Sequence, residues 1–314
     1  MKVAIVGSGF IGRAWAISFA RAGHDVAMWD RDAAASQDAR RTIAGLLGDL
    51  QGNDLLRGQE PEAVLDRISV TPDLADALAG AGYVQENTPE KIDVKREVFA
   101  LLDAAADPNA VIASSSSALL PSSFTEHLAR RDRCLVVHPL NPPYLIPAVE
   151  VVPAPWTSAE MVERTRAFLV DAGHAPLVLK RELDGFIINR LQGALLEEAF
   201  RLVADGYAGI EDVDAGIRDG LALRWSFIGP FETIDLNAPG GVRDYVERYQ
   251  GIYAALFPQM QRRVDWAGPV LDEVEAGRRA KLPATALGER QVWRDRRLMA
   301  LAAHKKRADD DIGR

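Results

Sequence analysis

The sequence predicts an α/β fold in which a mostly parallel sheet domain is followed by an all-helical domain. Short apolar segments such as KVAIVG (2–7) alternate with helical patterns through the first half of the chain. This alternation is typical of parallel sheets whose strands are buried on both faces. Strand patterns stop near Asp184-Gly185, and only helical periodicity follows. We therefore expect domains at residues 1–183 and 184–314.

Size and composition are those of a globular protein. The chain has 314 residues, of which 48% are hydrophobic and 26% are charged, enough for two domains with buried cores. The formal net charge of −8 disfavours nucleic acid and anionic membranes as partners. The single cysteine, Cys134, permits no internal disulfide. No segment approaches the ~20 apolar residues that span a bilayer, and no signal-peptide pattern precedes the first strand, so a cytoplasmic location is expected.

A glycine-rich turn, GSGFIG (7–12), follows the first predicted strand and opens a helix that stops near Gly23. Gly7 permits the tight turn, Gly9 lets the backbone approach a pyrophosphate, and Gly12 lets the helix pack on the strand. The N–H groups at the helix start would then face the phosphates. The residues expected to contact the cofactor here are Gly7, Gly9, Phe10, Ile11 and Gly12.

The second predicted strand, DVAMWD (25–30), ends in an acid. The Asp30 carboxylate can accept a hydrogen bond from the 2′-hydroxyl of an adenosine ribose, and it would repel a 2′-phosphate. A strand, a glycine turn, a helix and an acid in this order form a strong dinucleotide-binding signal. NAD is favoured over NADP, although the neighbouring Arg31 is of a type that can accommodate the phosphate.

The other predicted elements continue the alternation. In the first domain we expect helices at 33–50, 61–66, 74–78, 92–105, from 121 and at 159–172, with strands at 68–71, 83–86, 111–114 and 175–179. In the second domain we expect helices at 186–204, 210–218, 230–236, 242–256 and 289–306. Four serines, Ser114–Ser117, leave one strand at the carboxyl edge of the sheet, where ligands bind. The residues alone do not choose among these serines.

The segment VVHPLNPPYLIPAVEVVP (136–153) predicts a strand ending in His138, a stiff loop and a second strand carrying Glu150. An isolated histidine and glutamate would more often be structural residues. Here four prolines join the two strands, which favours a loop that must be rigid. A carboxylate that fixes the tautomer of an imidazole makes it a general base. We therefore expect His138 and Glu150 to pair.

The order and spacing of these motifs resemble the 3-hydroxyacyl-CoA dehydrogenase superfamily along nearly the whole chain. The motifs are VGSGFIG, the serine run before ALLPS, HPLNPP with the later VEVV, and DGFIINR. The chain is most similar to the lambda-crystallin and L-gulonate 3-dehydrogenase branch, through SSSSALLPS, GLALRWSFIGPFETIDLNAPGG and RQVWRDRRLMALA. The resemblance implies a Rossmann-like domain, a helical domain and a homodimer formed through the helices.

The resemblance also implies roles for individual residues. His138 is the base, Glu150 orients it, Ser117 binds the substrate oxygen, and Asn189 helps to fix substrate and histidine. The further NAD contacts that it implies are Asp30, Glu90, Lys95 and Asn141. No metal is expected, because the five histidines show no ligand spacing.

The substrate is inferred from charge. Residues 42–66 contain one basic residue, Arg57, against five acidic ones, a poor seat for the phosphates of CoA. Arg224 is a candidate clamp for a small carboxylate; an ordinary ion pair is an equal alternative before the resemblance is counted. We expect an L-gulonate-like 3-hydroxy acid. The alternative substrates are a 3-hydroxyacyl-CoA and carnitine. A further alternative is a non-enzymatic, crystallin-like role, but the complete Ser–His–Glu–Asn set argues against that role.

Overall fold

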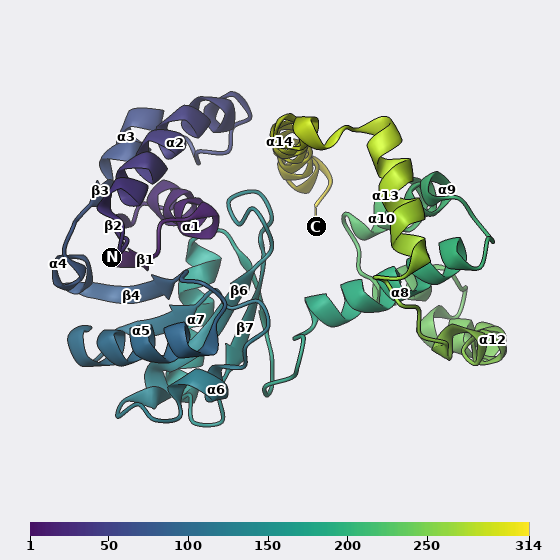
Figure 1. The fold of residues 1–314 in the computed structure, drawn as a ribbon, viewed down its shortest axis with the longest axis horizontal. Helices are drawn as coiled ribbons and strands as arrows, with labels where there is room; N and C mark the ends of the chain where they lie inside the picture. Colours follow the sequence, from purple (N-terminus) through teal and green to yellow (C-terminus); the bar gives the residue numbers. More distant parts are fainter. Residues whose placement is uncertain (314) are drawn as a thin grey trace. The chain divides into compact units, whose positions relative to one another are not determined.

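The computed structural model describes residues 1–313, and its N-terminal part is built on one eight-stranded sheet (Figure 1). The strands are β1 (Lys2–Val6), β2 (Asp25–Trp29), β3 (Ile68–Val70), β4 (Ala81–Glu86), β5 (Val111–Ser114), β6 (Cys134–Pro139), β7 (Ala148–Pro153) and β8 (Ala175–Val178). Their order is β3-β2-β1-β4-β5-β6-β7-β8. All neighbours are parallel except β6 and β7. The predicted mostly parallel, Rossmann-like sheet is confirmed.

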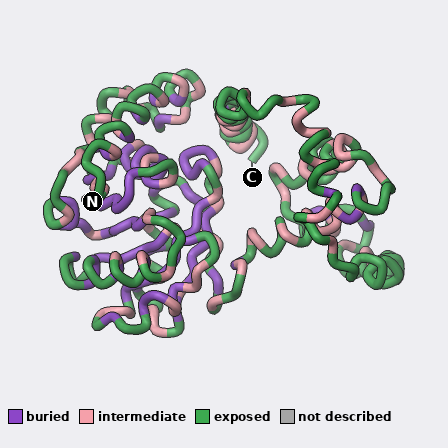
Figure 2. Tube along the Cα trace, in the orientation of Figure 1, coloured by how far each residue is buried: buried purple, intermediate pink, exposed green. Residues whose placement is uncertain are grey.

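Helices cover both faces of this sheet. They are α1 (Phe10–Arg21), α2 (Ala33–Gly52), α3 (Pro61–Asp66), α4 (Leu74–Leu78), α5 (Ile92–Ala105), α6 (Pro121–Thr125) and α7 (Ala159–Asp171). Side chains alternate along each strand, so Val3 and Ile5 join the core under α1, α2 and α7, whereas Ala4 and Val6 join the core under α4, α5 and α6. The central strands are accordingly buried along nearly their whole length in Figure 2, whereas the edge strands β3 and β8 are partly exposed.

The helix ends follow local sequence signals. Asp32 caps α2 by accepting a hydrogen bond from the Ala34 N–H, and Ser158 caps α7 in the same way. Gly23 has a φ of +89° just beyond α1, and Gly173 has a φ of +88° just beyond α7. Only glycine adopts this conformation without strain, which explains why both helices stop where the sequence predicts.

The C-terminal part is helical, as predicted. It contains α8 (Ile188–Ala204), α9 (Ile210–Ala215), a π-helical turn (Gly216–Leu221), α10 (Ala222–Trp225), α11 (Pro230–Leu236), α12 (Gly241–Leu256), α13 (Pro269–Lys281) and α14 (Leu287–Ile312). Helix α13 was not predicted, because only Val270 of its residues is buried and its apolar pattern is weak. Within residues 1–313, no helix has both the length and the apolar character needed to cross a bilayer.

By internal packing the chain divides into two compact units. The first unit is Met1–Asn189 with Trp293–Lys306; the second is Arg190–Val292 with the last residues of the chain. The single boundary expected between residues 183 and 184 differs from this division. The difference has a physical cause, because Met299 of α14 is buried in the core of the first unit, and Arg296 pairs with Asp49 of α2 at 3.2 Å.

Candidate active site

The predicted site residues of the first unit gather at the carboxyl ends of its central strands. The strand order reverses between β1 and β4, and ligands of open α/β sheets bind in the crevice at such a point. The glycine turn follows β1, Asn87 follows β4, the serine run follows β5, and His138 lies near the end of β6. Because these strands are parallel, their ends meet at one edge of the sheet.

The glycine turn packs tightly on the protein side and is open on the other side, as a pyrophosphate-binding turn must be. A Cβ on Gly7 would lie 2.9 Å from the Asn87 carbonyl oxygen, and one on Gly12 would lie 1.9 Å from the Gly7 carbonyl oxygen. A Cβ on Gly9 would meet nothing within 4 Å, so the backbone there borders open space. Phe10 begins α1 and is exposed, whereas Ile11 packs against the core. The first N–H groups of α1 have no partner within the helix and suit a phosphate.

Asp30 lies beside this turn. Its Oδ2 accepts hydrogen bonds from the Ser8 N–H at 2.7 Å and from the Ser8 hydroxyl at 3.0 Å. The carboxylate is therefore fixed at the end of β2 next to the phosphate-binding backbone, where a ribose would lie. Arg31 is exposed. The glycine cradle and this acid together fit NAD.

His138 and Glu150 form a buried pair. They are register partners on the antiparallel strands β6 and β7, and His138 Nδ1 lies 2.8 Å from Glu150 Oε2. The other carboxylate oxygen accepts backbone N–H bonds from Ile187 at 2.6 Å and Ile188 at 2.9 Å. Burial acts to raise the pKa of the Glu150 carboxyl, but the hydrogen bonds from His138 and the two N–H groups outweigh it and hold this pKa below its ordinary value. An ionised carboxylate thus orients the imidazole.

The segment that donates the Ile187 and Ile188 N–H groups to Glu150 also brings Asn189 to the serine run. Asn189 follows the two residues that bond to Glu150, and its Nδ2 donates to the Ser117 carbonyl oxygen at 2.7 Å. Ser117 is exposed, whereas Ser114 and Ser116 are buried and Ser115 bonds to Trp15, Gln85 and Asn87. Of the four serines, Ser117 is thus the one with an exposed residue position and a direct link to Asn189.

Glu90 and Lys95 are engaged within the protein. Glu90 Oε1 accepts bonds from the serine run, and Lys95 is only 1% exposed, with its ammonium 2.9 Å from both carboxylate oxygens of Glu86. Sequence reasoning missed Glu86, which is also fully buried at the end of β4. Two successive polar residues, Gln85 and Glu86, at the end of a buried strand are the signal that would have indicated it.

Two further residues were predicted to contact cofactor or substrate. Asn141 is exposed two residues after β6 and begins the Asn141–Pro142 segment of the stiff loop. Arg224 is exposed in α10, which belongs to the second unit. Their roles toward cofactor and substrate stay predictions.

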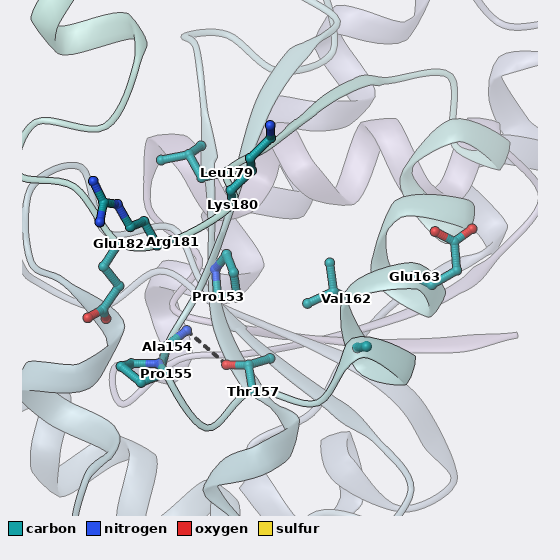
Figure 3. A pocket seen from close by; sticks show the side chains of 11 residues that line it. Pro153, Ala154, Pro155, Thr157, Val162, Glu163, Leu179, Lys180, Arg181 and Glu182 are labelled. Atoms are coloured by element: carbon teal, nitrogen blue, oxygen red, sulfur yellow. Dashed lines mark hydrogen bonds between the residues drawn. The ribbon is translucent and has the colours of Figure 1, made fainter.

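A surface pocket of about 450 Å³ lies elsewhere on the first unit (Figure 3). It is bordered by the end of β7, the start of α7 and the segment after β8, and none of the predicted site residues lines it. In Figure 3 its charged side chains diverge, with Arg181 pointing away from Glu163 and Lys180 pointing in a third direction. The pocket offers no convergent polar groups and is not part of the candidate site.

Comparisons with known proteins agree with this geometry. Residues 2–182 match the model of the 3-hydroxyacyl-CoA dehydrogenase NAD-binding domain, and residues 185–281 match the model of the C-terminal domain of the same family. Lambda-crystallin of Oryctolagus cuniculus is 40% identical, covering 97% of this chain and 96% of that protein. L-carnitine dehydrogenase of a Pseudomonas species is 35% identical, covering 95% and 92%.

Among solved structures, one similar chain is 5-formyl-3-hydroxy-2-methylpyridine 4-carboxylic acid 5-dehydrogenase, described as an NAD⁺-dependent dismutase. Its TM-score is 0.82 at 26% identity, and the match covers 97% of both chains. The matched family domains span both units, and the glycine cradle fits the cofactor that the family model names. This protein therefore belongs to the 3-hydroxyacyl-CoA dehydrogenase family and is an NAD-dependent oxidoreductase of the 3-hydroxyacid type.

Proposed function

We propose that this protein oxidises a small, L-gulonate-like 3-hydroxy acid to its 3-keto acid, with NAD as acceptor and His138 as general base. The observation that carries the proposal is the 2.8 Å contact between His138 Nδ1 and Glu150 Oε2, in which the carboxylate is itself held by two backbone N–H groups. NAD, when bound, supplies the acceptor for the hydride that leaves the substrate carbon.

The histidine takes the proton of the substrate hydroxyl. Because Glu150 is ionised, it accepts the Nδ1–H of His138, which leaves the lone pair on Nε2. As Nε2 gains the hydroxyl proton, the ring becomes an imidazolium, and the adjacent carboxylate stabilises the new charge. Phe186 packs at 5.6 Å between ring centroids and limits rotation of the imidazole.

Ser117 and Asn189 provide the polar groups for the reacting oxygen. The Ser117 hydroxyl can donate to the oxygen as it becomes a carbonyl, and Asn189 holds the Ser117 backbone. In the reverse reduction the same groups act in the opposite order.

The charges of the first unit favour a free acid over a CoA thioester. Arg57 is the one basic residue in 42–66, and it donates to the Asp171 carbonyl oxygen at 2.8 Å. Of the cations of helix α14, Arg296 and Lys306 pair with acids of this region, Asp49 and Asp54. Cations already neutralised by carboxylates are poor ligands for the phosphates of CoA. Arg224 is our candidate for the substrate carboxylate.

Carnitine is the second candidate substrate. Carnitine carries a carboxylate and a quaternary ammonium. The match to the L-carnitine dehydrogenase of a Pseudomonas species covers 95% of this chain. Trp225, next to Arg224, is 40% exposed. An exposed indole face is a ligand for a quaternary ammonium.

A homodimer formed through the helical unit completes the proposal. Phe227, Phe231 and Leu236 of α10–α11 and the adjacent loop are 72%, 80% and 69% exposed within one chain. Large apolar side chains gathered on neighbouring elements mark an interaction surface. We infer that a second copy of the chain covers it, because most soluble oligomers are symmetric homo-oligomers.

The substrate is tested by measuring NADH oxidation with a panel of keto compounds: 3-keto-L-gulonate, acetoacetate, acetoacetyl-CoA and 3-dehydrocarnitine. We expect turnover of a free 3-keto acid and little turnover of the CoA thioester. Strong turnover of acetoacetyl-CoA alone would contradict the substrate assignment.

The base is tested by His138→Gln, which we expect to lower kcat by about 10²–10⁴-fold. The matched control is His127→Gln, because His127 is exposed and borders a separate surface pocket. Full activity of His138→Gln would exclude the proposed base.

A further inference from the structure

Two glutamates in and after β4 have no part in the proposed reaction, yet they organise the residues that do. Glu86 ends β4, and Glu90 lies in the connection to α5. The connection passes the glycine turn on one side, because the Asn87 carbonyl oxygen is the nearest neighbour of a Cβ built on Gly7. On the other side it contacts the serine run through hydrogen bonds of both glutamates.

One carboxylate oxygen of Glu90 accepts four hydrogen bonds from the turn that carries Ser117. Oε1 accepts bonds from the Ser116 hydroxyl at 2.5 Å and from three successive backbone N–H groups. These belong to Ser117 at 3.1 Å, Ala118 at 3.0 Å and Leu119 at 3.1 Å. Successive N–H groups pointing into one hollow normally form an anion-binding site. Here the anion is a side chain of the protein, so the turn is built around Glu90.

The Ser117 backbone is consequently held from two sides. Its N–H donates to Glu90 Oε1, and its carbonyl oxygen accepts from Asn189 Nδ2 at 2.7 Å. With both neighbouring peptide groups fixed, the position of the Ser117 Cβ is set, and the hydroxyl has only its χ1 rotation left. Loss of the Glu90 carboxylate would release one of these two restraints.

The buried Glu86–Lys95 pair lies near Glu90, and the charge of Lys95 helps to keep the Glu90 carboxylate ionised. The Lys95 ammonium is bonded to both oxygens of Glu86 and to the Thr88 carbonyl oxygen at 3.0 Å, so its three donors are used inside the protein. Glu86 Oε2 also accepts from the Ser114 hydroxyl at 2.6 Å. Burial acts to raise the pKa of Glu90, but its hydrogen bonds and the charge of Lys95 hold this pKa below the ordinary value.

We propose that Glu90 is a positioning residue that acts on the reaction through Ser117, by holding the 116–119 turn in the shape that presents the Ser117 hydroxyl. This inference rests on the proposed role of Ser117 in substrate binding. It assigns to Glu90 a task other than the NAD contact that the family resemblance implies.

A double-mutant cycle tests this role with Glu90→Ala, Ser117→Ala and the double variant. We expect Glu90→Ala to lower kcat by about tenfold or more, and to lower it less than about twofold when Ser117 is already alanine, because residues that act as a unit are not additive. NADH affinity, measured by fluorescence titration, stays within about twofold. Glu90→Gln retains more activity than Glu90→Ala, because an amide oxygen still accepts the N–H bonds. Independent losses, or a matching loss of NADH affinity, would overturn the proposal.

Hydrogen exchange provides a readout that needs no substrate. In the wild-type protein the amides of residues 117–119 are bonded to Glu90, so the peptide that contains them exchanges slowly for an exposed turn. Glu90→Ala should accelerate this exchange by about tenfold, with Glu90→Gln between the two proteins and peptides of β2 unchanged as control. Unaltered exchange in Glu90→Ala would refute the positioning role. If exchange accelerates but none of the panel is turned over, the proposed function fails and the structural role of Glu90 stands.

Discussion

The two units bury their apolar residues to different extents. In the first unit Trp15, Phe19 and Phe99 are fully buried between helices and sheet. In the second unit the buried apolar residues are few, and Phe231 and Phe227 are mostly exposed. Figure 2 shows this contrast as buried strands in the first unit and a largely exposed helical trace in the second.

This difference assigns the proposed chemistry to one unit and the proposed dimer contact to the other. The residues proposed for catalysis, Ser117, His138, Glu150 and Asn189, all belong to the unit that packs its own core. Hydrogen bonds of 2.6–2.9 Å fix Glu150 there, and such precision requires a rigid frame. The helical unit exposes the apolar area that a partner would cover.

The largest expected effect is a core substitution in the first unit. Phe19 is 0% exposed and packs on Trp15 with ring centroids 5.1 Å apart. Phe19→Ala should lower the free energy of unfolding by about 3–5 kcal/mol, measured by urea denaturation. Phe231→Ala, measured at protein concentrations too low for association, is the matched control and should change it by less than about 0.5 kcal/mol. Equal losses would contradict the contrast between the units.

Lowering the pH should reduce the free energy of unfolding of the first unit, because the buried His174 must then take up a proton. Burial, with the nearby charge of Arg21, lowers the pKa of His174 from 6.5 to about 4. Because the unfolded chain takes up this proton near pH 6.5 and the folded chain only near pH 4, stability is lost as the pH falls through that window. His174 should contribute about 2 kcal/mol of the loss between pH 7 and pH 5.

The measurement compares urea denaturation of the wild type and of His174→Gln at the two pH values. His24, whose pKa is also lowered by burial, acts in the same direction in both proteins. We expect a smaller pH dependence in the variant. An unchanged pH dependence would show that His174 is not the group responsible.

The smallest expected effect concerns the apolar surface of the second unit. Phe231→Asp places a charge on the surface proposed for the second copy and should raise the dimer dissociation constant by about tenfold or more, measured by analytical ultracentrifugation. Arg243→Asp on α12, an exposed position, is a stringent surface control, because it lowers the net charge by two where Phe231→Asp lowers it by one. A wild-type protein that is monomeric at micromolar concentration would contradict the homodimer.

The local chemistry of the site was predictable from the sequence because it is encoded by residue order. In the sequence, the glycine turn and Asp30 are separated by one helix and one strand. In the structure they lie side by side at the ends of the adjacent parallel strands β1 and β2, where the Ser8 N–H donates to Asp30. The spacing of His138 and Glu150 predicted a pair, and the antiparallel register of β6 and β7 produces it. The family resemblance indicated Ser117, and the bond from Asn189 supports that choice.

Tertiary packing determined the features of the site and of α14 that the sequence did not predict. Neither the burial of Lys95 on Glu86 nor the turn built around Glu90 is visible in sequence. The first depends on how α5 packs beside the end of β4, and the second joins Glu90 to a turn that follows another strand, β5. The return of α14 to the first unit was equally hidden, since one buried residue, Met299, anchors it and its overall pattern is polar. Sequence periodicity reports which face of an element is apolar, and tertiary structure alone determines what that face meets.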